Sequence, residues 1–71
     1  MTLRSAQEGK EYIIKDILTN DDDLDAFLLT LGCYAGEPIT VISGRRSGYI
    51  VSIKDGRYCI DAQLADAITV V

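Results

Sequence analysis

The stretch ITVISGRRSGYIVSIKDGRYCI, residues 39–60, decides the fold of this chain. Its second half alternates between apolar and polar side chains, which places Tyr49, Val51 and Ile53 on one face of an extended segment. Glycine-containing segments interrupt the pattern at regular intervals, as turns do between short strands. The stretch therefore predicts three consecutive strands, over 39–43, 49–54 and 57–60.

Two kinds of connection are expected between these strands. The first is a loop flanked by glycines, made of Gly44, Arg45, Arg46, Ser47 and Gly48. The second is a tight turn at residues 55–56, whose Asp-Gly sequence is typical of a type I′ hairpin because both central residues need a positive φ. Both connections predict antiparallel pairing of neighbouring strands.

A further strand is predicted upstream, over 12–18, where β-branched and aromatic residues are concentrated. Its apolar side chains fall on both faces, Tyr12 and Ile14 on one, Ile13 and Ile17 on the other. Such a pattern is typical of a strand that is buried on both sides, for example a barrel wall covered by a helix. The residues before it form a polar opening that contains Leu3 and Ala6 and ends in a turn at 9–10.

A helix is predicted between the strands at 12–18 and 39–43. Leu24, Phe27, Leu28 and Leu31 recur at the spacing i, i+3, i+4, i+7, which places them on one face of an α-helix. Leu29 lies off this stripe and is expected to be partly exposed. The apolar face is expected to pack against the strands.

Signals at both ends of this segment agree with the helix. Asn20, Asp21 or Asp22 can accept hydrogen bonds from the free N–H groups of the first turn. The neighbouring acidic residues complement the positive end of the helix dipole. Gly32 occupies the position after the last turn, where a left-handed residue is favoured.

At the other end of the chain, Asp61 can cap a single helical turn over 62–67, and residues 68–71 form a last short strand. Five short strands in 71 residues are too few for a two-layer sandwich. They can close into a small barrel, which would also remove exposed sheet edges. The chain is therefore predicted to be mainly β and to form one domain, residues 1–71, with one α-helix after the first strand.

Composition restricts the function. Seven basic and eleven acidic residues give a net charge of −4, so a nucleic-acid backbone would repel the chain as a whole. The absence of histidine removes the usual general base and zinc ligand, and the glycines form no phosphate-binding loop, so no enzymatic activity is expected.

The chain is expected to be a cytoplasmic monomer with no membrane insertion. No apolar run is long enough to cross a bilayer, and the first residues lack the apolar core of a signal peptide.

In its element order and spacing the chain resembles the ferrous iron transport protein A (FeoA) family, small bacterial proteins with an SH3-like β-barrel. The resemblance is carried by Leu3 and Gly9 before the first strand, by the helix end Leu-Leu-Thr-Leu-Gly at 28–32, by Gly36, and by the Ala-Ile-Thr-Val segment at 67–70. The family typically has a proline before the second glycine, basic residues early in the helix and an arginine after the last hairpin strand. This sequence has Ala35, the segment 25–27 and Asp61 at those places.

The resemblance implies an accessory protein of ferrous iron uptake. The implied partner is the membrane permease FeoB, at its cytoplasmic G-protein portion. The same barrel also resembles the C-terminal domain of iron- and manganese-dependent repressors, so an interaction module of that kind is the alternative. A shared fold does not by itself determine function.

Candidate contact residues lie in two segments. The first is the turn made of Cys33, Tyr34, Ala35 and Gly36, where Tyr34 either anchors a partner or folds back onto the helix end. The second is the 44–48 loop, whose Arg45-Arg46 pair either meets an acidic partner surface or is simply solvated. An anionic lipid headgroup is a third option for the arginine pair.

No metal site or cofactor is predicted. Asp21, Asp23 and Asp25 imitate the start of a calcium loop, but Ala26 and Gly32 stand where that loop requires glycine and glutamate. Helix capping accounts for the same acidic residues, which would also suit a weak, nonspecific association with Fe²⁺ or Mg²⁺. The two cysteines, at positions 33 and 59, are expected to be buried free thiols rather than a disulfide or a metal site.

Overall fold

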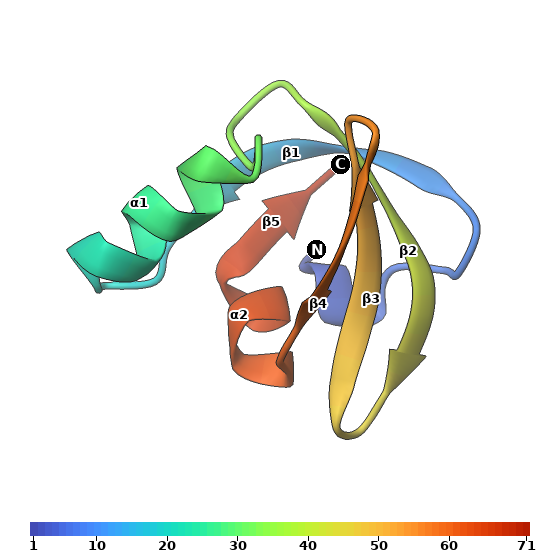
Figure 1. The fold of residues 1–71 in the computed structure, drawn as a ribbon. Helices are drawn as coiled ribbons and strands as arrows, with labels where there is room; N and C mark the ends of the chain where they lie inside the picture. The colour runs from blue at the N-terminus through green and yellow to red at the C-terminus, as the bar shows by residue number, and fades with distance from the viewer.

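The computed structural model describes residues 1–71 and contains five strands, two α-helices and one short 3₁₀ helix (Figure 1). The predicted order of strands and helices is confirmed. In chain order, the elements are η1 (Leu3–Ser5), β1 (Glu11–Ile17), α1 (Asp22–Thr30), β2 (Pro38–Arg45), β3 (Gly48–Ile53), β4 (Gly56–Ile60), α2 (Ala62–Ala67) and β5 (Ile68–Val70).

All strand pairs are antiparallel, and the strand order is β4-β3-β2-β1-β5. The first half of β1 pairs with β2, with Tyr12 opposite Ile39. Its second half pairs with β5, with Ile17 opposite Ile68, after an irregularity between Ile14 and Asp16. This bulge lets one strand bend from one part of the curved sheet to the other.

The sheet curls around a single core of thirteen apolar residues. The strands contribute alternate positions such as Val51 and Ile53, as the alternating sequence predicted. Leu3 of η1 is fully buried in this core, so the polar opening of the chain contains a core anchor. No polar or charged residue is buried, and none of the helices is both long and apolar enough to span a membrane.

The strands form a small curved barrel, as expected, but the sheet keeps two edge strands that do not pair with each other. β4 and β5 are the two end strands and share no hydrogen-bonded ladder. Instead, α2 connects β4 to β5 and contacts η1, β3 and β5 (Figure 1). A short helix therefore connects the two end strands and completes the barrel.

The prediction that β1 is buried on both faces is wrong. Tyr12 and Ile14 are buried, but Ile13 is 39% exposed and Ile17 is only half-buried. The physical reason is the direction of α1, which extends away from the barrel and does not cover the outer face of β1 (Figure 1).

The apolar face of α1 is also less buried than the spacing predicted. Leu28 is the only buried residue of α1, and Phe27, which was expected to face the core, is 50% exposed. Leu29 is exposed, as expected.

The two predicted connections are shorter or shifted in the structure. β2 continues to Arg45 and β3 begins at Gly48, so only Arg46 and Ser47 lie outside the strands of the expected five-residue loop. The second turn contains Lys54 and Asp55 rather than residues 55–56, because Ile53 pairs with Gly56. Lys54 has a φ of +53°, whereas Gly56 belongs to β4.

Candidate interaction surface

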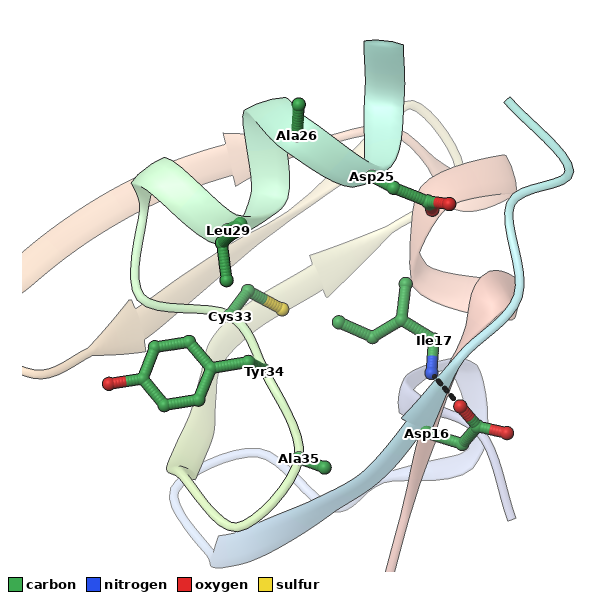
Figure 2. Close-up of a pocket in the computed structure, with 8 residues that line it drawn as sticks. All are labelled: Asp16, Ile17, Asp25, Ala26, Leu29, Cys33, Tyr34 and Ala35. Atoms are coloured by element: carbon green, nitrogen blue, oxygen red, sulfur yellow. Dashed lines mark hydrogen bonds between the residues drawn. The ribbon is translucent and has the colours of Figure 1, made fainter. Parts of the chain in front are cut away.

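An open groove of about 340 Å³ lies between α1 and the end of β1. We call it the α1 groove; six of its eight lining residues are hydrophobic. Figure 2 shows α1 along one side, the 33–35 segment below it, and Ile17 across from Cys33. The lining residues are Asp16, Ile17, Asp25, Ala26, Leu29, Cys33, Tyr34 and Ala35.

The end of α1 determines which side chains face this groove. Gly32 has a φ of +88°, its N–H donates to the carbonyl of Leu29 at 3.0 Å, and the N–H of Cys33 donates to the carbonyl of Leu28 at 2.9 Å. These two bonds form a Schellman motif, which satisfies the last helix carbonyls and reverses the chain direction. After this reversal Cys33 is buried and Tyr34 is exposed.

Residues 34–37 then form a tight turn that is attached to β1. The N–H of Glu37 donates to the carbonyl of Tyr34 at 3.2 Å, and Gly36 has a φ of +93°, as the third residue of a type II turn requires. The N–H of Gly36 donates to the carbonyl of Ile14 at 2.8 Å, and the N–H of Ile14 donates to Glu37 at 2.9 Å. Tyr34 is therefore presented on a turn whose backbone is fixed to the barrel.

Lys54 links this turn to the β3–β4 hairpin. Its Nζ lies 3.2 Å from Glu37 Oε2 and 5.3 Å from the centre of the Tyr34 ring. The neighbouring Tyr34 side chain and then the carboxylate of Glu37 raise the pKa of Lys54, because both favour the charged ammonium. The Tyr34 ring therefore lies beside the ammonium group of Lys54, which comes from the turn between β3 and β4.

One of the acidic residues at the start of α1 caps the helix, as predicted. Asp21 is the N-cap, and its Oδ1 accepts from the N–H groups of Asp23 at 2.9 Å and Leu24 at 3.2 Å. Asp25 accepts a hydrogen bond from the hydroxyl of Thr19. No group of three or more acidic, cysteine or histidine side chains converges in a way that could hold a metal ion.

The groove also has a polar side. Asp16 and Asp25 lie to the right of the view in Figure 2, whereas Tyr34 lies to the left. Asp16 Oδ1 accepts from the N–H of its neighbour Ile17 at 2.8 Å. An apolar groove with carboxylates at its margin suits an apolar side chain that has a basic neighbour.

The cysteines differ from each other. Both are free, and Cys33 is buried, as expected, but Cys59 is exposed on the outer face of β4, where the sequence predicted burial. Cys59 lies opposite the exposed Ile50 in the β3–β4 pair, because that face of the sheet has no covering element. Burial raises the pKa of the Cys33 thiol to about 11, since the thiolate would lose its hydration.

The two segments predicted to make contacts do not lie together. The 33–36 turn precedes the start of β2, and Arg45 is at the other end of the same strand. Eight residues of strand correspond to roughly 25 Å, so the segments lie at opposite ends of the β2–β3 hairpin. The sequence also showed no sign that Asp16, Ile17 and Leu29 line the groove. Their proximity to Cys33 depends on the orientation of α1 relative to the end of β1.

Comparison with known proteins identifies this architecture. A family model described as "FeoA domain" matches residues 1–71. A crystal structure of an iron uptake regulatory protein, FeoA, has a TM-score of 0.84 at 25% identity, with 99% of this chain and 92% of that chain covered. A zinc complex of FeoA from Stenotrophomonas maltophilia, a prokaryotic SH3 domain protein, has a TM-score of 0.84 at 19% identity, covering 100% and 89% of the two chains.

The barrel is also similar to part of a larger protein. A manganese-dependent transcriptional repressor matches with a TM-score of 0.90 at 19% identity, covering 100% of this chain but 40% of the repressor chain. None of the curated protein sequences matches this chain. The structural similarities confirm the predicted SH3-like fold, and with a family model that spans every residue, the chain belongs to the FeoA family, which is linked to ferrous iron transport.

Proposed function

We propose that this protein is a non-enzymatic, cytoplasmic accessory of ferrous iron uptake that binds the cytoplasmic portion of a FeoB-type iron permease. The observation that carries the proposal is the α1 groove in a member of the FeoA family. Leu29 is 60% exposed and Tyr34 is 37% exposed beside it, on a backbone that hydrogen bonds attach to β1. Exposed apolar and aromatic anchors on a rigid support are typical of protein interaction surfaces.

Binding would act by conformational selection. If the cytoplasmic portion of the permease exchanges between two states, a partner that contacts one state more tightly shifts the population toward it. The shift can be no larger than the difference between the two binding free energies. The proposed contacts are the 33–36 turn with the α1 groove, and the 44–48 segment at the other end of the hairpin.

A pull-down with the cytoplasmic portion of the permease tests the proposal. Replacing Leu29 and Tyr34 together by alanine should weaken binding about tenfold or more, because truncated anchors of this kind each cost more than about 1 kcal/mol. Ile42→Ala with Ile50→Ala is the matched control, since both side chains are similarly exposed but lie on strands outside the groove. Equal binding by the two double variants would exclude the groove as the contact.

The similarity to the repressor barrel favours a second candidate function. In that case the chain would be an interaction module that self-associates or contacts a partner in a metal-dependent way. Analytical ultracentrifugation with and without Fe²⁺ separates the two candidates. A permease accessory of the kind proposed remains monomeric in both conditions, whereas a repressor-type module changes its sedimentation when the metal is added.

A further inference from the structure

Three of the seven basic residues of this acidic chain gather around one pocket. Arg45 ends β2 and Arg46 lies in the turn to β3, whereas Arg4 comes from η1 near the start of the chain. They line a hollow of about 350 Å³ together with Gly44, Tyr49 and Ala62. The sequence indicated only Arg45 and Arg46 as a basic cluster, because Arg4 is distant along the chain and approaches them only in the folded structure.

None of these arginines is neutralised within the molecule. The only salt bridge joins Lys54 to Glu37, beyond the other end of β2 and β3. Three guanidinium groups therefore surround the pocket without a carboxylate within 4 Å. Positive charges held together in this way repel one another, and an anionic ligand would relieve that repulsion.

The wall of the pocket is built from closely packed groups. A Cβ on Gly44 would lie 2.9 Å from Cε2 of Tyr49, so the tyrosine ring lies directly against the glycine backbone. The N–H of Gly44 donates to Glu8 Oε2 at 2.7 Å, which holds that carboxylate next to, but not among, the lining residues. Glu8 is therefore a negative charge beside the pocket, and it would repel an external anion.

We propose that this pocket binds a carboxylate-rich segment of a protein partner. Each guanidinium presents a planar set of donors that matches a carboxylate in a bidentate way. A flexible acidic peptide can enter the hollow and contact the three arginines alone, whereas a broad planar anionic membrane would also face the surrounding surface of a chain whose net charge is −4. The inference deepens the proposed function by giving the chemistry of a second contact, and it rests on that function only for the identity of the partner.

Fluorescence polarisation tests the pocket with the full chain at low ionic strength. The probe is a fluorescein-labelled peptide of alternating aspartate and glutamate. The variant Arg4→Gln, Arg45→Gln, Arg46→Gln should bind the peptide roughly tenfold more weakly, as expected for the loss of three partly solvated ion pairs. Glu8→Gln, which keeps an acceptor for Gly44, should bind it about twofold more tightly, because a repulsive charge is removed.

The control is Lys10→Gln, Lys15→Gln, Arg57→Gln, which removes the same charge at positions outside the pocket. Equal loss of binding in both triple variants would show nonspecific attraction and overturn the proposal. So would the absence of any peptide binding, or stronger binding to phosphatidylserine vesicles than to the peptide. The Leu29→Ala, Tyr34→Ala variant should bind the peptide as tightly as the unmodified chain, because neither residue lines the arginine pocket. The permease pull-down therefore tests the α1 groove, and the peptide assay tests the arginine pocket independently.

Discussion

Replacing Gly32 by alanine tests how the end of α1 positions the groove. The residue has a φ of +88°, a conformation that costs an L-residue with a side chain roughly 1–2 kcal/mol. The new Cβ would also lie 2.9 Å from Cε and 3.0 Å from Cδ of Lys54, so the lysine stem must move. Since that side chain is half-exposed, its displacement is expected to add only a few tenths of a kcal/mol.

The expected loss of stability is therefore about 1–2 kcal/mol, which lowers the Tm of a chain of this size by roughly 5–15 °C. Circular dichroism melts and urea unfolding measure this loss. Gly36→Ala is the matched control: its φ is +93° and a Cβ there would meet nothing within 4 Å. The Gly36→Ala variant should therefore lose only the free energy of unfolding that the left-handed backbone conformation costs.

A double-mutant cycle separates the two contributions. If the Cβ of the Gly32→Ala variant crowds Lys54, then Lys54→Ala should be less destabilising in that variant than in the unmodified chain. Loss of less than about 0.5 kcal/mol in Gly32→Ala, the level of an ordinary surface substitution, would refute the left-handed helix end and with it the burial of Cys33.

Three further predictions follow from the groove and its surroundings. Ala35 occupies the second position of the type II turn and its N–H makes no hydrogen bond, so Ala35→Pro should raise the free energy of unfolding by about 0.4–1 kcal/mol in urea titrations. Asp21→Ala should cost about 1 kcal/mol through loss of the N-cap, whereas Asp23→Ala should change stability by less than half of that in the same titrations. The pKa of Cys33 rises from 9.0 to about 11 on folding, so the folded state binds the proton more tightly and stability should fall as pH increases from 9 to 11. Urea unfolding across this range should show a steeper decline for the unmodified chain than for Cys33→Ala, and Cys59→Ala should retain the steep decline.

Local features of the fold could be predicted because each depends on residues close together in the chain. The N-caps at Asp21 and Asp61 and the left-handed Gly32 satisfy backbone groups within one helical turn. The inward positions Val51 and Ile53 follow from strand alternation alone. These signals were sufficient for the element order and for the FeoA resemblance.

Predictions failed where burial depends on packing between distant elements. Phe27 lies on the apolar stripe of α1, yet it is exposed because only the end of the helix, at Leu28, meets the core. Ile13 is exposed because no helix covers the outer face of β1. The shift of the second turn to Lys54 and Asp55 follows from strand register, which the pairing of Ile53 with Gly56 determines.

The sequence by itself determined a mainly β chain with two capped helices, because propensity, capping and alternation act over a few neighbouring positions. Only the tertiary structure decided that Leu29 and Ile17 share a groove with Cys33, and that Arg4 joins Arg45 and Arg46. Both assemblies depend on the bend in β1 and the curl of the sheet. These arise from the summed packing of the core, and no local pattern records them.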